Sequence, residues 1–192
     1  MARLITVRTL IATVFNYSLN GLLPDEGTED YQFCMGLPED PVDAEQSLDL
    51  VRSADAHIMG RVAYEEIAAA QQAVPDHPPL AAMTAARKVV FSRTLQTADW
   101  ANTTIAAGDT AEEIEKLKRG GDGHIVVWGG RRFWRSLTRL DLIDEFHLDV
   151  YPYMAAEGTR LFEDVPKSFR LDLISSTAWS NGVVGLHYRR HR

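Results

Sequence analysis

Apolar residues along this chain occur in two patterns, short continuous runs and stretches in which they recur every three or four residues. The short runs, bounded by glycine or polar residues, predict buried strands, and the periodic stretches predict amphipathic helices. The predicted strands span residues 5–15, 56–59, 88–91, 103–106, 124–128 and 145–151, and the predicted helices span residues 42–53, 64–72, 110–119 and 131–138. Strands that alternate with helices indicate an α/β protein with a mostly parallel sheet.

The end of the chain has a different pattern. Residues 169–179 and 183–189 predict two further strands, joined by Ser180-Asn181-Gly182. Asn-Gly between two strand patterns is a strong signal for a hairpin. We therefore expect a three-layer αβα fold whose mixed sheet ends in a C-terminal antiparallel hairpin. Since no segment has the composition of a linker, residues 1–192 are expected to form a single domain.

Residues 18–41 predict a long irregular connection because glycine and proline recur throughout this segment. A connection of this length in a compact domain is usually functional or mobile. We expect it to act as a lid that helps to select the substrate.

The charge of the chain is unevenly distributed. The net charge is −7, and nine acidic residues but no Lys or Arg lie between Arg8 and Arg52. Sequence-independent nucleic-acid binding depends on Lys and Arg that neutralise phosphates, so this charge argues against it.

The remaining composition describes an ordinary globular protein. The chain has 192 residues, of which 45% are hydrophobic, and its one cysteine, Cys34, excludes an intramolecular disulfide. The six histidines are scattered without metal-ligand spacing, so no metal is expected. No apolar run approaches the roughly 20 residues of a membrane helix, and we expect a cytoplasmic protein.

Three predicted strands end in turns with similar chemistry. Gly60-Arg61 follows one strand, Ser92-Arg93 follows another, and Gly129-Gly130-Arg131 follows a third. In open α/β sheets, ligands bind beyond the carboxyl ends of the strands, where glycine permits close approach and helix N-termini attract phosphate. These turns predict a nucleotide site, although the Rossmann G-x-G-x-x-G and the P-loop motif are both absent.

An ordered set of short motifs resembles a known family. The motifs are Ser18-Leu19-Asn20-Gly21, residues 58–65 (IMGRVAYE), residues 90–93 (VFSR), residues 127–130 (VWGG), residues 142–145 (LIDE), Tyr151-Pro152 and Gly158-x-x-Leu161-Phe162. Together they resemble the dihydrofolate-reductase-like superfamily over nearly the whole chain. Within it, the chain is most similar to the C-terminal reductase domain of the bifunctional riboflavin-biosynthesis deaminase-reductase and its stand-alone relatives.

The resemblance implies an NADPH-dependent reductase of a small heterocyclic or imine-like substrate, either pterin-like or pyrimidine-like. The cofactor-binding positions that it implies are Asn16, Gly60, Arg61, Val62, Ser92, Arg93, Gly129, Gly130, Arg131 and Phe133. In the family, the two glycines are often joined by a cis peptide bond. Two arginines beside a serine also suit a 2′-phosphate, which favours NADP over NAD.

The substrate side of the site departs from the family pattern. Asn20 is the expected substrate contact, but the riboflavin enzymes usually carry Asp at this position, and Ala63 stands where Thr is frequent. Asp43 or Glu45 could supply the buried acid that folate reductases carry near the start of the preceding helix. The proton donor stays open between water, Tyr17, Asp43 and Glu45.

Two alternative functions remain at this point. One is a true riboflavin-pathway 5-amino-6-(5-phosphoribosylamino)uracil reductase, and the other is a nucleotide-binding module without turnover. Relatives commonly pair as homodimers, and the apolar segment 151–154 is the expected interface.

Overall fold

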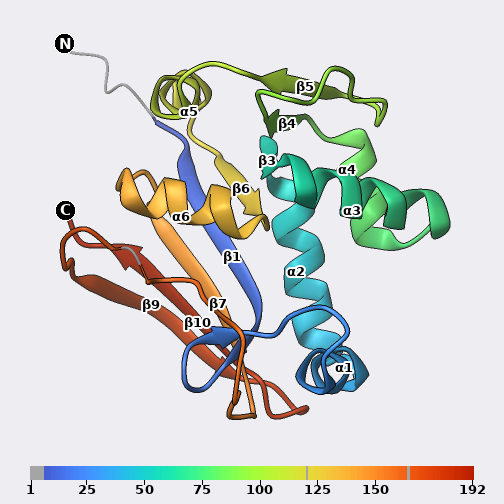
Figure 1. The fold of residues 1–192 in the computed structure, drawn as a ribbon, viewed down its shortest axis with the longest axis vertical. Helices are drawn as coiled ribbons and strands as arrows, with labels where there is room; N and C mark the ends of the chain where they lie inside the picture. The colour runs from blue at the N-terminus through green and yellow to red at the C-terminus, as the bar shows by residue number, and fades with distance from the viewer. Residues whose placement is uncertain (1–6, 120, 164) are drawn as a thin grey trace.

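The computed structural model describes residues 7–119, 121–163 and 165–192. The strands are β1 (Thr9–Ser18), β2 (Leu22–Leu23), β3 (Ala56–Gly60), β4 (Lys88–Phe91), β5 (Thr103–Ala106), β6 (His124–Trp128), β7 (Glu145–Tyr151), β8 (Thr159–Arg160), β9 (Leu171–Ala178) and β10 (Val184–Arg190). The helices are α1 (Glu29–Gly36), α2 (Pro41–Ser53), α3 (Arg61–Ala73), α4 (Pro78–Ala85), α5 (Thr110–Lys118) and α6 (Arg131–Arg139). Figure 1 shows their arrangement.

Eight of these strands form one twisted sheet in the order β5-β4-β3-β6-β1-β7-β10-β9. The strands from β5 to β7 are parallel, whereas β10 runs antiparallel to both β7 and β9. The short strands β2 and β8 pair separately. The mixed sheet with a C-terminal antiparallel hairpin confirms the expected fold class.

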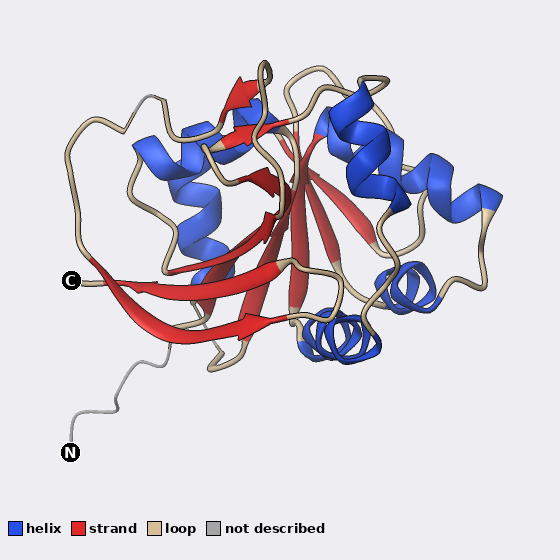
Figure 2. Cartoon of the chain, turned by 90° about the horizontal axis from the view of Figure 1, so that it is seen from below, coloured by secondary structure: helices blue, strands red, loops and turns tan. Residues whose placement is uncertain are grey.

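Helices cover both faces of the sheet, which gives the three layers visible in Figure 2. One face packs the apolar sides of α5 and α6 into a cluster that includes Trp134, Leu137 and Phe146. The other face packs α2, α3 and α4 around Met59, Val90 and Trp100. The central strands are buried on both faces, as parallel strands between helical layers must be.

The prediction of an irregular connection over residues 18–41 was wrong. This segment contains β2 and the helix α1, whose first turn is capped by the Thr28 side chain. The sequence analysis predicts no helix over α4, which begins with Pro78 and Pro79; proline is tolerated in a first helical turn. Residues 5 and 6 of the first predicted strand and Gly120 lie outside the described residues.

Two further features are absent from the described residues. They contain no helix of the length and hydropathy that a membrane crossing requires. They also contain no group of three or more His, Cys, Asp or Glu side chains placed to bind a metal ion.

Candidate functional site

The three predicted turns lie side by side at one edge of the sheet. β4, β3 and β6 are neighbours and parallel, with Gly60 opposite Phe91 and Met59 opposite Trp128. A Cβ atom added to Gly130 would lie 3.7 Å from the Gly60 backbone. The residues after these strands therefore converge, as the sequence predicts.

The two glycines after β6 have a backbone conformation that few other residues adopt. Gly129 and Gly130 have φ values of 39° and 80°, a conformation that favours glycine. Gly130 is the N-cap of α6 and supplies no side chain to cap it. The first N–H groups of α6 are therefore not capped by this residue and can bind an anion. All peptide bonds in the described ranges are trans, so the Gly129–Gly130 bond lacks the cis form frequent in the family.

Phe133 supports this edge from inside the molecule. It is 9% exposed and stacks on Phe91 with ring centroids 4.7 Å apart. A Cβ atom on Gly60 would approach the Phe133 Cβ to 3.2 Å. Phe133 therefore packs beneath the turns, and in this structure it is a core residue.

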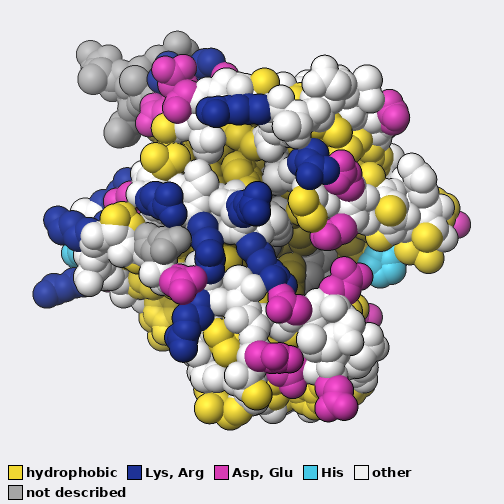
Figure 3. Space-filling model, in the orientation of Figure 1, with side chains coloured by type: hydrophobic (Ala, Val, Ile, Leu, Met, Phe, Trp, Pro, Cys, Tyr) yellow, Lys and Arg dark blue, Asp and Glu magenta, His cyan; other side chains and the backbone are white. Residues whose placement is uncertain are grey.

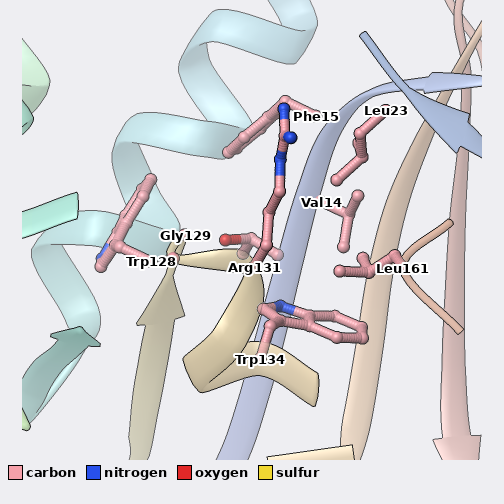
Figure 4. Close-up of a pocket in the computed structure, with 10 residues that line it drawn as sticks. Val14, Phe15, Leu23, Trp128, Gly129, Arg131, Trp134 and Leu161 are labelled. Carbon is pink, nitrogen blue, oxygen red and sulfur yellow. The ribbon is translucent and has the colours of Figure 1, made fainter. Parts of the chain in front are cut away.

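An apolar cavity of about 190 Å³ opens beside the two glycines. Figure 4 shows Trp128 and Trp134 at two sides of it, with Phe15 and Leu23 near its mouth. Its other lining residues are Thr13, Val14, Gly129, Gly130, Arg131 and Leu161. Such an apolar cleft with a few polar groups at its rim is typical of a site for a flat organic ring.

Trp128 is held in place by a buried histidine that the sequence analysis did not single out. The Trp128 indole N–H donates a hydrogen bond of 2.9 Å to His57 Nδ1. His57 is fully buried, and this burial, together with Lys88, lowers its pKa to about 4. His57 is therefore neutral near pH 7 and can accept this hydrogen bond.

Arg131 lies at the cavity and is already engaged by the chain. Its guanidinium forms an ion pair with Asp25 and hydrogen bonds with Thr159 Oγ1 at 2.6 Å and the Pro24 carbonyl at 3.2 Å. It therefore fastens the segment after β2 to the start of α6, and an anionic ligand would compete with Asp25 for it.

The other positions implied for the adenosine phosphates are the residues that follow β3 and β4. The Arg61 side chain pairs with Glu65 at 2.7 Å, and Val62 is exposed. Ser92 Oγ accepts hydrogen bonds from the backbone N–H groups of Thr94 and Leu95, so this hydroxyl stabilises its own turn. Arg93 is exposed and has no partner among the described residues, which leaves its guanidinium available to a ligand.

Asn16 lies in a bulge of β1. The pairing of β1 with β7 shifts between Val14 and Tyr17, and Asn16 has a φ of 59°. The Tyr153 hydroxyl donates a hydrogen bond of 3.1 Å to the Asn16 carbonyl. Phe15, which precedes Asn16 in this bulge, lines the cavity and is 40% exposed.

The Asn20 side chain is used by the chain itself. Its Oδ1 accepts hydrogen bonds from the Ser18 hydroxyl and the Ala155 N–H, and its Nδ2 donates to the Ala155 carbonyl at 2.8 Å. An aspartate could not donate this last bond. The Asn20 amide therefore fastens the β1–β2 turn to the segment after β7.

Of the two candidate acids, only Asp43 faces the interior. Glu45 is exposed on α2, so it does not provide the buried acid that the resemblance implies. Asp43 is half-buried, and its pKa is raised by burial and by the neighbouring carboxylates Asp40 and Glu39. A second acid, Asp149 on β7, was missed, although its place between apolar residues of a strand was visible in the sequence.

The charges are segregated on the surface that carries the site. Figure 3 shows Lys and Arg side chains gathered over the region of α6, whereas Asp and Glu gather at the end that carries α1. The basic residues of α6 are Arg131, Arg132, Arg135 and Arg139. This side of the edge attracts anions, which favours a phosphate-bearing ligand.

The fold and the convergence of the three turns at one edge of the sheet are those of the dihydrofolate-reductase-like superfamily. The sequence profile of the RibD C-terminal domain matches residues 9–185, and the chain belongs to this family.

Comparison with individual proteins agrees with this assignment. The chain is 36% identical over 103 residues to the uncharacterized protein YyaP of Bacillus subtilis (strain 168), and the match spans about half of each chain, 53% and 54%. A solved structure of a protein from Shewanella sp. PV-4, described as a candidate riboflavin biosynthesis protein, has a TM-score of 0.74 at 21% identity, over 96% of this chain and 99% of that one. Dihydrofolate reductase from Enterococcus faecalis, complexed with NADP(H), has a TM-score of 0.61 at 15% identity, over 98% and 100%.

Proposed function

We propose that this protein is an NADPH-dependent reductase that transfers a hydride to a small heterocyclic or imine-like substrate of the pterin or pyrimidine type. The observation that carries this proposal is the convergence of Gly60, Ser92 and Gly129-Gly130 at one sheet edge, next to an apolar cavity. NADPH is also the cofactor type of the superfamily.

The residues at this edge fit the shape and charge of a dinucleotide phosphate. Gly129 and Gly130 present backbone at the start of α6, where a side chain would fill the space next to Gly60 and Ala63. They would hold the pyrophosphate together with Arg131. Gly60, Arg61, Val62, Ser92 and Arg93 would hold the adenosine phosphates, and Arg93 is the free cation suited to a 2′-phosphate.

The cavity is suited to the reacting ring. When bound, NADPH supplies the hydride. The side chains of Phe15, Trp128 and Leu161 give the cavity apolar walls, from which a bound ring would displace water. Exclusion of water and fixed orientation are the main contributions of a protein to hydride transfer.

A binding experiment tests the proposal directly. Titration with NADPH and NADH, followed by nicotinamide fluorescence, is expected to give tight binding of NADPH and weaker binding of NADH. Gly130→Ala is expected to abolish NADPH binding, because φ at this residue is 80° and the added Cβ would occupy the space proposed for the pyrophosphate.

Gly27→Ala is the matched control. Gly27 has a φ of 85°, similar to that of Gly130, but apart from its chain neighbours no atom of a described residue lies within 4 Å of the position of an added Cβ. This variant carries the same backbone strain but adds no atom to the space proposed for the pyrophosphate. Its affinity for NADPH is therefore expected to match that of the wild type. Absence of NADPH binding by the wild-type protein would contradict the proposal.

Nicotinamide fluorescence also reports oxidation of NADPH when a substrate is added, and this measurement separates the remaining alternatives. Tight NADPH binding without oxidation by any pterin, cyclic imine or pyrimidine would favour a nucleotide-binding module. Reduction of a ribosylaminopyrimidine alone would favour the riboflavin-pathway reaction. The use of Asn20 in loop packing, where those enzymes usually have a carboxylate, is the structural observation against that reaction.

A further inference from the structure

Asp149 lies one strand away from the cavity mouth. In the β1–β7 pairing, Leu148 is opposite Val14 and Val150 is opposite Tyr17, so Asp149 lies beside the β1 bulge of Phe15 and Asn16. On its other side, Asp149 is opposite Gly185 of β10. Side chains alternate along a strand, so Asp149 lies on the opposite face from Leu148 and Phe146, which pack into the α6 side of the core.

The surroundings of Asp149 keep its carboxyl protonated up to about pH 7. It has no hydrogen-bond partner in the described part of the chain, and burial raises its pKa to about 7, with the charge of Asp43 as the second cause. From its own strand, Tyr151 has a pKa raised to about 12 and stays neutral. The next pair along this face is His147 and His187, which are stacked 3.8 Å apart, and burial lowers the pKa of His187 to about 4.

Asp43, whose charge acts on Asp149, lies in the first turn of α2, and this turn is held in place by Asp40. Asp40 caps this helix through its Oδ1, while its Oδ2 accepts hydrogen bonds from the Ser180 N–H and hydroxyl at 2.8 and 2.6 Å. These bonds tie the first turn of α2 to the hairpin turn between β9 and β10. Of two coupled carboxyl groups in such a setting, the more buried one keeps the proton.

The hairpin also brings an unpaired donor to this place. Trp179 is 8% exposed, and its indole N–H has no hydrogen-bond partner within residues 7–119, 121–163 and 165–192. Its Nε1 lies 3.2 Å from the point where a Cβ on Gly185 would be, and Asp149 Oδ1 lies 3.4 Å from that point. Buried polar groups are normally paired, so an unpaired N–H beside an unpaired carboxyl indicates a place for a polar ligand.

We propose that Asp149 is the acid that donates the proton required when a C=N bond is reduced, an inference that rests on the proposed reductase function. The carbon of the C=N bond accepts the hydride from NADPH. The nitrogen accepts the proton of the Asp149 carboxyl, so an N–H bond forms as the O–H bond breaks. The carboxylate then regains a proton from water, and the Trp179 N–H binds an acceptor atom of the substrate ring.

The other possible donors are less well suited. Tyr17 packs on the α6 side of the core, where its ring meets Phe162 edge-on at 5.9 Å, and burial raises the pKa of its hydroxyl, which makes it a weaker acid. Glu45 is exposed to solvent. Asp43 is the neighbour whose negative charge keeps the proton on Asp149.

The first test is a titration of the protein labelled with ¹³C at the aspartate carboxyl carbons. One resonance is expected to titrate near pH 7 and to disappear in Asp149→Asn. In Asp43→Asn this resonance is expected to titrate at lower pH, because the repelling charge is removed. Asp49→Asn, an exposed position on the same helix, is the matched control and should leave the resonance unchanged.

The second test uses 2-methyl-1-pyrroline and 7,8-dihydropterin as substrates with NADPH. For the wild type, kcat/KM is expected to fall as pH rises above about 7. For Asp149→Asn, kcat/KM is expected to be lower by a factor of about 100 or more, because general acid catalysis contributes factors of this size. The fall of kcat/KM above about pH 7 is expected to disappear in this variant. The affinity for NADPH is expected to stay unchanged, which also shows that the variant is folded.

The outcomes distinguish this inference from the proposed function. An Asp149 carboxyl that titrates near its ordinary pKa would contradict the inference, as would a variant with the wild-type rate and pH profile. In either case NADPH binding and turnover would leave the reductase function intact. A wild-type protein that binds no NADPH, or that reduces no pterin, cyclic imine or pyrimidine, would instead contradict the proposed function, whatever the carboxyl titration shows.

Discussion

The Trp128 indole N–H donates a 2.9 Å hydrogen bond to Nδ1 of His57, which lies on the neighbouring strand and is fully buried. This bond fixes one wall of the cavity, where Trp128 also stacks with Phe15 at 6.2 Å between ring centroids. The orientation of the ring that forms the site is therefore determined by a residue of the core.

His57→Leu is expected to weaken NADPH binding and to lower the free energy of unfolding by about 1–3 kcal/mol, because the Trp128 N–H loses its acceptor. His57→Gln keeps an acceptor and should retain most of both quantities. Denaturant unfolding and Trp fluorescence measure the effect. Equal losses in both variants would show that the volume of His57 matters and its hydrogen bond does not.

His57 also predicts a dependence of stability on pH. Its pKa is lowered to about 4 in the folded protein from 6.5, so between these values the unfolded chain binds more protons. The stability contributed by the neutral histidine is therefore complete above pH 6.5 and is lost as the pH falls toward 4. Urea unfolding at several pH values should show a shallower decline for His57→Gln than for the wild type.

Arg93→Ala is expected to weaken NADPH binding far more than NADH binding, because the exposed Arg93 guanidinium would bind the 2′-phosphate, which only NADPH carries. Arg87→Ala, which removes an exposed arginine before β4, is a suitable control. Calorimetric titration with both cofactors measures the ratio. Equal losses for NADPH and NADH would exclude Arg93 from 2′-phosphate recognition.

Asp25→Asn is expected to strengthen NADPH binding several-fold at low ionic strength, because the ion pair with Arg131 competes with the pyrophosphate. Glu26→Gln removes a neighbouring charge that has no such pair and should have a smaller effect. If Asp25→Asn weakens binding, the pair is needed to keep Arg131 in position.

We also expect a homodimer that uses residues 151–154. Met154 is 66% exposed and Pro152 is exposed, whereas Tyr153 packs on Phe33 within the chain. Light scattering at micromolar concentration should give twice the mass of the chain, and Met154→Lys should reduce it. A monomeric mass for the wild type would contradict this expectation.

The sequence determined the elements whose signals are local. The predicted bounds of the strands at 124–128 and 145–151 agree with β6 and β7. In both cases a short run with apolar residues is bounded by glycine or polar residues, and such a run is typical of a buried strand. The convergence of the three turns also followed from the sequence, since the carboxyl ends of neighbouring parallel strands must meet at one edge.

Tertiary structure decided how the polar groups of the site are used. The pairing of Arg131 with Asp25, of Asn20 with Ala155 and of Trp128 with His57 joins residues that are 71 to 135 positions apart. Such contacts depend on strand order and on side-chain direction, which no local pattern encodes. For the same reason, Asp149 reads as an ordinary strand residue in the sequence, and only packing against Asp43, Gly185 and Trp179 gives it an environment that changes its chemistry.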